Sequence, residues 1–282
     1  MTIELDHIKW TMYNGALIPD APPHIEIKLT RNQARYLLRK SKAYFLRWSS
    51  DFDCGFETEW WYLVRDKGID LNEFESKRRR EIQKGLRNCM VKKVDAAFLA
   101  QNGYEVYSSA FASYDTFLKP AGEEEFISRM MSRKDNPIFD FWAGFDKTDG
   151  QLIGYFMNRL GEDFCLYSAA KFKPDSLHLG VHHALVYQMT NYYLSEMGLK
   201  YVCTGARSIS HKTNAQEFLI KKLHYRKAYC RLNIIYRPII GILAKSLYPF
   251  RNIISKIDTN VTNKITVLLR QEKIRRSFSD KK

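Results

Sequence analysis

The sequence predicts an α/β fold with a mixed, mostly antiparallel sheet and helices on both of its faces. Three observations in the second half of the chain lead to this prediction. Apolar segments at Phe139–Phe145 and Gln151–Asn158 flank the turn Lys147–Gly150, which is the pattern of a β-hairpin. A third apolar strand, Asp163–Phe172, leads through a loop into a long helix ending near Met197. A strand, a helix and a final strand follow, so that helices are expected to cover the sheet.

The other elements follow from the same patterns of apolar residues and turn residues. Ile8–Leu17 predicts a hairpin, because Asn14 and Gly15 favour the tight turn between two strands. Three parts are expected, namely a degenerate N-terminal lobe (1–136), a domain (137–238) and a tail of basic amphipathic helices (239–282). The remaining predicted helices are Arg31–Lys40, Asp70–Asn88, Ala96–Phe117, Glu123–Met131 and Thr213–Leu223, and the remaining strands are Ala43–Trp48, Trp60–Val64, Met90–Val94, Leu199–Thr204 and Tyr225–Tyr236.

Composition places the chain among globular proteins. A hydrophobic content of 45% supports a substantial core, which excludes an intrinsically disordered protein. The five cysteines form no CxxC pair, so neither a disulfide framework nor a structural zinc site is expected, and no metal is predicted. No segment approaches the roughly 18–20 apolar residues of a membrane span, and the N-terminus does not resemble a signal peptide. A cytoplasmic protein is therefore expected.

Positive charge is concentrated in a few segments. The chain carries a net charge of +14, and residues 237–282 alone contain eleven basic and three acidic side chains. A second cluster is Lys77–Arg80, followed by Lys84 and Arg87. Such clusters attract nucleotides, nucleic acid or anionic lipid, or they form a solvated helix face.

The tail leaves two interpretations open. Ile239–Tyr248 is apolar but short, and we expect it to pack against the domain. Phe250–Ile257 and Val261–Leu269 alternate apolar and basic residues. This pattern is typical of helices that lie on an anionic membrane surface, and also of helices that pack with a basic face in water. Peripheral association with the inner face of the membrane is one expectation.

A glycine loop before the long helix predicts an anion site. The free backbone N–H groups and the dipole at a helix N-terminus favour a phosphate. His182 and His183 could contact that phosphate or act as a base, or they could be partly buried helix histidines. The residues expected at the phosphate are Leu179, Gly180, Val181 and His182.

A polar loop after the strand Leu199–Thr204 is the best candidate for a substrate site, because ligands gather at the carboxyl ends of strands in open α/β sheets. Arg207 could hold a phosphate or carboxylate of a substrate, and Ser208 and His211 are the catalytic candidates. Capping of the next helix is the alternative role for the serine. Glu59 could bind an amine substrate, although a surface salt bridge is the simpler role.

Three segments resemble one known family. Leu177–His182 is similar to the pyrophosphate loop Gln/Arg-x-x-Gly-x-Gly/Ala of the GNAT acyltransferase superfamily, with Gly180 as the first glycine. Thr213–Tyr225 resembles the motif Asn-x-x-Ala-x-x-Leu-Tyr-x-Lys-Leu-Gly-Phe. Glu59–Leu63 and Ser76–Leu86 look like the first-lobe region of the branch of Fem-type peptidoglycan aminoacyltransferases. The chain departs from these motifs at Leu177, His182, Thr213, Ile220, His224 and Tyr225.

The resemblance implies a GNAT-like fold and a transferase that uses acetyl-CoA or another acyl-CoA as donor. In this superfamily two neighbouring strands splay apart and backbone amides polarise the thioester. The corresponding positions here are around Leu166, Ser168 and Ala169. Ile220 stands where many of these enzymes keep a tyrosine as general acid, so the leaving group would take its proton elsewhere.

Three classes of function follow. The first is a CoA-dependent N- or O-acyltransferase whose acceptor is a small molecule, such as an amino sugar, or a lipid-linked cell-envelope precursor. The second is a Fem-like aminoacyltransferase using aminoacyl-tRNA, whose backbone would bind the basic surface. The third is a non-catalytic module that binds a phosphorylated ligand or a membrane. The short chain, without an inserted helical arm, favours CoA over tRNA.

Overall fold

A computed structural model describes residues 2–114, 119–209, 214–257 and 259–278. The chain forms two compact units, and each contains more than one stretch of sequence. The first unit comprises residues 1–63, 206–217 and 226–282, and the second comprises 64–205 and 218–225. Strand pairing joins residues on either side of position 136 within the second unit, and helix–strand packing joins residues on either side of position 238 within the first unit.

The first unit contains a mixed sheet with the strand order β1-β2-β3-β4-β11-β5. The pairs β1–β2, β2–β3 and β4–β11 are antiparallel, whereas β3 and β4 are parallel. The predicted N-terminal hairpin is confirmed, and Asn14 and Gly15 both take the positive φ that its turn requires. The strands are β1 (Thr2–Leu5), β2 (Ile8–Tyr13), β3 (Ala16–Pro19), β4 (Phe45–Ser50), β5 (Trp60–Arg65) and β11 (Arg226–Tyr236).

Helices cover both faces of this sheet. Leu46 of β4 packs in one cluster with α1, whereas Leu232 of β11 packs with Ile274 of α10. Because Ile235 belongs to the α1 cluster and lies three residues from Leu232, α1 and α10 lie on opposite faces. The helices of this unit are α1 (Arg31–Lys40), α8 (Pro238–Leu247), the 3₁₀ turn η4 (Tyr248–Phe250), α9 (Arg251–Ile254) and α10 (Asn260–Ser277), and α7 (Asn214–Leu223) begins here.

The second unit contains strands in the order β10-β9-β8-β7-β6. All neighbours are antiparallel except β9 and β10, which are parallel. The predicted hairpin around Lys147–Gly150 is confirmed as the β7–β8 pair. The strands are β6 (Cys89–Val94), β7 (Phe139–Asp146), β8 (Leu152–Leu160), β9 (Phe164–Phe172) and β10 (Tyr201–Ala206, of which Ala206 belongs to the first unit).

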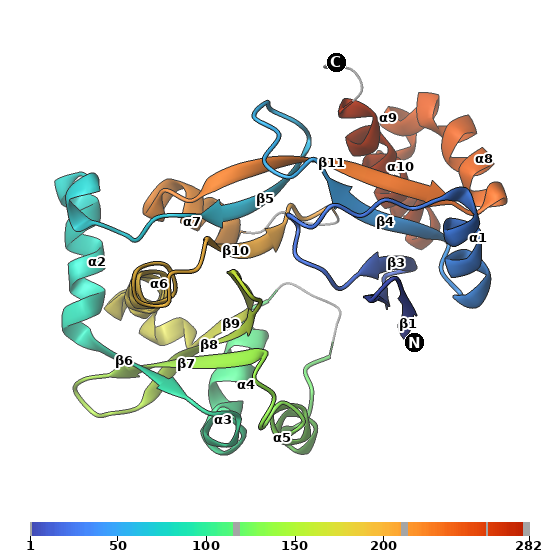
Figure 1. Cartoon of the computed structure of the whole chain (residues 1–282). Helices are drawn as coiled ribbons and strands as arrows, with labels where there is room; N and C mark the ends of the chain where they lie inside the picture. The colour runs from blue at the N-terminus through green and yellow to red at the C-terminus, as the bar shows by residue number, and fades with distance from the viewer. Residues whose placement is uncertain (1, 115–118, 210–213, 258, 279–282) are drawn as a thin grey trace. The chain divides into compact units, whose positions relative to one another are not determined.

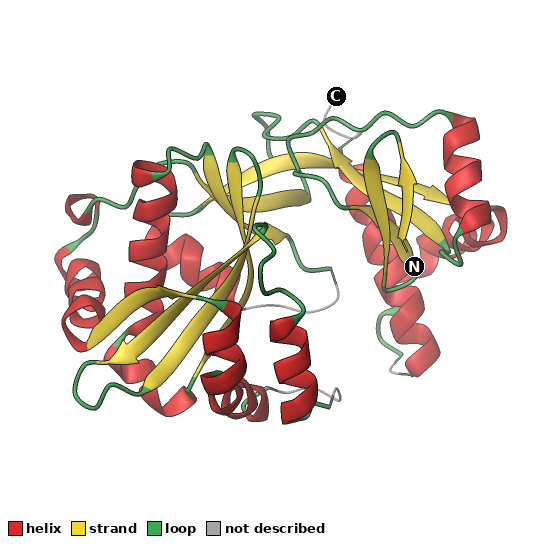
Figure 2. Cartoon of the chain, turned by 60° about the horizontal axis from the view of Figure 1, so that its bottom comes forward, coloured by secondary structure: helices red, strands yellow, loops and turns green. Residues whose placement is uncertain are grey.

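Here too, helices cover both faces. Figure 1 shows α6 on one side and α3–α5 on the other, and Figure 2 shows helices on both sides of these strands. Phe141 and Ala143 of β7 pack against α3–α5, whereas Trp142 donates a hydrogen bond to Tyr193, which follows α6. The predicted fold class is therefore confirmed. The helices are the 3₁₀ turn η1 (Leu71–Glu73), α2 (Ser76–Asn88), α3 (Ala96–Asn102), α4 (Tyr104–Ala112), α5 (Glu123–Met131), η2 (Pro174–Leu179), α6 (Val181–Asn191) and the π turn η3 (Tyr192–Glu196).

Two predicted helices are each divided. The helix expected over 70–88 begins as η1, capped by Asp70, and restarts as α2 after an extended Phe74. The helix expected over 96–117 breaks at Gly103, whose N–H still bonds Leu99, and α4 ends at Ala112. Competition from an aspartate cap explains the first break. At the second, a Cβ on Gly103 would lie 2.6 Å from the carbonyl oxygen of Leu99, so the close turn there requires glycine.

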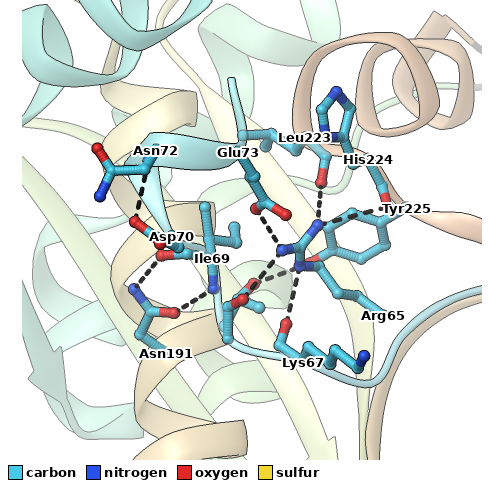
Figure 3. A network of polar contacts seen from close by, with 12 residues as sticks. Arg65, Lys67, Ile69, Asp70, Asn72, Glu73, Asn191, Leu223, His224 and Tyr225 are labelled. Atoms are coloured by element: carbon cyan, nitrogen blue, oxygen red, sulfur yellow. Dashed lines mark hydrogen bonds and ion pairs between the residues drawn. The ribbon is translucent and has the colours of Figure 1, made fainter. Parts of the chain in front are cut away.

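A buried arginine joins the end of β5 to the helices around it (Figure 3). Arg65 is 5% exposed and donates to the carbonyl oxygens of Lys67, Gly68 and Leu223 at 2.8–2.9 Å. It also pairs with Glu73 at 2.5 Å. Because the last carbonyls of a helix have no intrahelical partner, the guanidinium caps the C-terminus of α7.

Candidate active site

In the second unit, the two parallel strands β9 and β10 stop pairing partway along their length. The register of β9 and β10 runs through three residue pairs and ends at Leu166 and Cys203, although β9 continues to Phe172. The next residue of β10, Thr204, has a buried hydroxyl without a hydrogen-bond partner in the described part of the chain. The strands expected to separate do so, and an unsatisfied polar atom lies where they part.

A β-bulge lies directly beside the point where this pairing ends. Tyr167 pairs with Asn158 of β8 and Ala169 pairs with Met157, so Ser168 is an extra residue in β9. Its side chain is exposed, and its hydroxyl donates to the carbonyl oxygen of Leu166 at 3.4 Å. A bulge breaks the regular ladder and redirects backbone groups, and bulges are frequent beside active sites. The predicted positions Leu166, Ser168 and Ala169 thus surround the bulge, and their binding role stays a prediction.

Helix α2 packs closely against the start of α6, where the sequence predicts a phosphate site. Gly180 and Val181 are buried, and the N–H of Gly180 already bonds Leu177 at 3.1 Å. A Cβ on Gly180 would lie 3.0 Å from the Cα of Gly85 in α2. The glycine, at φ +86°, therefore allows close approach of α2, and the role of Leu179–His182 at a phosphate stays a prediction. Leu179 precedes it on the half-buried end of η2.

Two adjacent histidines follow this turn on α6. His183 is 7% exposed, and both of its ring nitrogens lack a hydrogen bond within the described residues; Nδ1 of His182 does too. The ring of Phe218 lies 4.9 Å from that of His182 and 5.0 Å from that of His183. Glu81 of α2 lies 3.8 Å from Nε2 of His183 and 3.6 Å from Nζ of Lys222.

Burial keeps both histidines neutral. Removal from water lowers the pKa of His182 to about 4 and the pKa of His183 to about 3. The ring of His182 and the cations of Arg78 and Lys222 also lower the pKa of His183. At neutral pH they are therefore uncharged imidazoles in an aromatic setting rather than cations that would hold a phosphate.

Acid is expected to destabilise the fold through these side chains. Below about pH 6.5 the unfolded chain protonates both histidines, whereas the folded chain does not until its pKa values of about 4 and 3 are reached. The free energy of unfolding should therefore fall as pH drops from 6.5 toward 4, by about 2 kcal/mol per histidine at pH 5. Urea titrations at pH 7 and pH 5 measure it. His183→Gln should reduce the difference and His178→Gln, at an exposed site, should not; equal differences in both variants would refute this assignment.

The residues predicted for the substrate site lie in the first unit. Arg207 donates to the carbonyl oxygen of Glu59 at 2.8 Å and forms an ion pair with its carboxylate. Lys273 of α10 lies 4.0 Å from the same carboxylate. The surface salt bridge suggested for Glu59 is therefore confirmed, and its partner is the arginine expected to hold a substrate. Ser208 is half-buried beside this pair, and His211 lies outside the described residues.

Sequence reasoning missed the contribution of α2. Gly85 and Glu81 lie about one helical turn apart and meet α6 nearly a hundred residues later in the chain. A glycine inside a strongly helical segment was the available signal, because it costs helix stability and commonly marks close packing. His224 stands where the resembled motif has glycine, and its φ of +53° shows why glycine suits that position.

The chain is similar in structure to several solved proteins, although its sequence matches no family model and no curated protein. The structure of FemX aligns over 86% of this chain and 85% of its own, with a TM-score of 0.57 and 10% identity. L-PGS from Bacillus licheniformis aligns over 94% and 85%, with a TM-score of 0.51 and 10% identity.

The C-terminal domain of a putative lysylphosphatidylglycerol synthetase from Agrobacterium fabrum aligns over 85% of this chain and 83% of its own. Its TM-score is 0.50 and its identity 13%. These likenesses concern the fold alone. The chain therefore has the fold that these structures share, and this agrees with the resemblance of its sequence to the Fem-type branch.

Proposed function

We propose that the chain is a transferase that moves an aminoacyl group from aminoacyl-tRNA to an amine or hydroxyl acceptor. The observation that carries this proposal is the bulge at Ser168 of β9, at the point where β10 leaves. Backbone N–H groups released from a ladder can polarise an activated carbonyl and stabilise the oxyanion that forms on it. The thioester of an acyl-CoA and the ester of an aminoacyl-tRNA both present such a carbonyl.

The chemistry requires little more than position and proton transfer. The acceptor nitrogen or oxygen attacks the ester carbonyl, and the tetrahedral intermediate then expels the 3′-terminal ribose hydroxyl of the tRNA. The acceptor loses one proton and the ribose oxygen gains one, so the step is balanced without a metal or redox partner. Holding both groups in place supplies much of the rate.

The covered start of α6 favours tRNA over CoA as donor. A pyrophosphate at Gly180 would need open N–H groups, whereas α2 packs there and the neighbouring histidines are neutral. Acyl-CoA transfer remains the second candidate, because the loop Leu177–His182 resembles a pyrophosphate loop and the separated strands would serve a thioester equally well.

The outer side of α2 supplies a surface for an RNA backbone. Four basic residues on this helix are exposed, and their spacing of three, four and three residues places them on one face. Over ten residues this stripe extends about 15 Å, enough to follow several phosphates. The stripe consists of Lys77, Arg80, Lys84 and Arg87.

For the acceptor we propose a chemical class and not a single compound. One of the similar structures is a putative lysylphosphatidylglycerol synthetase, a name that describes an amino acid joined to a lipid. A lipid-linked or cell-envelope acceptor with a free amine or hydroxyl, such as an amino sugar, fits the same chemistry. A small soluble acceptor would use the same site.

Ligand-induced stabilisation tests the choice of donor. The chain is heated with charged tRNA carrying a non-hydrolysable amide linkage, with uncharged tRNA, with acetyl-CoA and with CoA. A ligand that binds only the folded state at a hundred times its Kd adds about 2.7 kcal/mol. Charged tRNA should stabilise the protein most and acetyl-CoA should not. Stabilisation by acetyl-CoA alone would establish the second candidate instead.

Charge reversal locates the bound RNA. The triple variant Lys77→Glu/Arg80→Glu/Lys84→Glu should weaken tRNA binding and lower the slope of log K against log salt by about one per residue. The matched control is Arg31→Glu/Arg35→Glu/Arg39→Glu, which reverses three exposed residues on one face of α1. Equal losses in both variants would mean that the RNA binds by net charge and not on α2.

A further inference from the structure

A second surface, in the first unit, is unusually apolar. From Ile239 to Ile257 six large apolar side chains are exposed, and three of them are more than 60% exposed. Single exposed apolar residues are normal on proteins, whereas a contiguous group usually marks an interaction site. This apolar surface consists of Ile239 (78%), Ile242 (67%), Leu243 (39%), Phe250 (56%), Ile253 (64%) and Ile257 (50%).

Five of these six side chains lie on α8, η4 and α9, which follow one another without interruption, and Ile257 lies three residues beyond α9. Successive members of the group are 3, 1, 7, 3 and 4 residues apart, which are spacings that favour one face of a helical segment. The opposite side is anchored to the unit. Ala244 is fully buried, the ring of Tyr248 lies under the guanidinium of Arg276 at 3.9 Å, and α8 and α9 contact α10. The expectation that Ile239–Tyr248 packs on the domain thus holds for one side only.

All charged side chains of this segment are positive. Residues 237–257 contain four basic residues and no acidic one. Lys245 and Lys256 are exposed and lie within the same segment as the apolar residues. A second copy of the chain would bring this positive charge against itself, which is unfavourable. Anionic phosphate headgroups over an apolar layer complement both properties.

We propose that α8, η4 and α9 lie in the interface of an anionic lipid bilayer, with the apolar surface inserted below the headgroups and the lysines at the level of the phosphates. Interfacial helices bind in this way through an apolar face and a basic border. Within the described residues, no helix is long and apolar enough to cross a membrane. The proposal does not depend on the identity of the donor.

Vesicle flotation of the full chain tests this proposal. We compare vesicles of neutral phosphatidylcholine with vesicles that also contain phosphatidylglycerol. The parent should bind the anionic vesicles, and binding should weaken as salt is raised. Each lysine near an anionic surface contributes about 1 kcal/mol, so Lys245→Glu/Lys256→Glu should bind at least about 25-fold more weakly.

An apolar variant and its matched control separate insertion from general charge attraction. Ile242→Asp/Ile253→Asp should lose vesicle binding, and because both side chains are more than 60% exposed it should keep the melting temperature of the parent. The control Ile25→Asp/Ile138→Asp changes two isoleucines that are also exposed, at 43% and 44%, and should bind like the parent.

Three results would overturn the proposal. They are equal binding to neutral and anionic vesicles, equal losses in the two isoleucine variants, and no binding of the parent at excess anionic lipid. Sedimentation of the same proteins covers self-association. If the parent is a dimer that Ile242→Asp/Ile253→Asp dissociates, the apolar surface is an interface between copies and not a membrane surface.

Discussion

Arg65→Met is expected to lower the free energy of unfolding by about 3–5 kcal/mol, because removing one member of a buried charged network leaves its partners unsatisfied. The side chain is 5% exposed and donates to three carbonyl oxygens at 2.8–2.9 Å as well as to the carboxylate of Glu73. Methionine has a similar length but no donor. The carbonyl of Leu223 at the end of α7 would lose its cap, and Glu73 would lose its partner (Figure 3).

Denaturant titration of the variant measures this loss. The matched control is Lys67→Met, since Lys67 enters the network through its backbone carbonyl and its own side chain is exposed. Exposed substitutions of this kind usually change stability by less than about 0.5 kcal/mol. If Arg65→Met costs no more than this control, the network does not hold the helices in place.

The second large effect is expected for Gly85→Ala, which should change stability in the opposite direction from most glycine-to-alanine changes in helices. In an exposed helix interior this change stabilises by about 1 kcal/mol. A Cβ on Gly85 of α2 would lie 2.4 Å from the carbonyl oxygen of Gly180, and this neighbour is backbone that a side-chain rotation cannot move. Overpacking of this kind costs about 1–3 kcal/mol, so Gly85→Ala should destabilise the protein by about 2 kcal/mol.

Gly241→Ala in α8 is the internal comparison, because its Cβ would meet only Cβ of Tyr236 at 3.4 Å. This second change should raise stability by about 0.5–1 kcal/mol, in line with helix propensity. Both variants are measured by the same denaturant titration. If both variants raise, or both lower, the free energy of unfolding, α2 does not approach the start of α6 as closely as the structure shows.

Local sequence patterns predicted much of the fold. The Asn14-Gly15 turn, helix Arg31–Lys40 and the hairpin of β7 and β8 depend on neighbouring residues, and the structure has all three. The breaks at Phe74 and Gly103 were missed, because a cap or a glycine competes with a helical pattern by only about 1 kcal/mol.

The site was less predictable because its contacts are distant in sequence. The resemblance to the GNAT superfamily implied that two strands separate near Leu166, and the pairing of β9 with β10 ends there. The pairing of Arg207 with Glu59 joins segments 148 residues apart, and no local pattern specifies it. The contact of Gly85 with Gly180 likewise depends on how α2 packs, and no local pattern specifies it.

We propose that the carbonyl of the donor lies at the bulged part of β9. Hydrogen exchange of the full chain, with and without tRNA carrying an amide-linked amino acid, can detect it there. Free backbone N–H groups exchange quickly, and those that bond a ligand are protected. We expect bound charged tRNA to slow exchange in the segment Tyr167–Ala169 at least about tenfold more than uncharged tRNA does. Charged tRNA that binds the protein yet leaves exchange at Tyr167–Ala169 unchanged would contradict the claim.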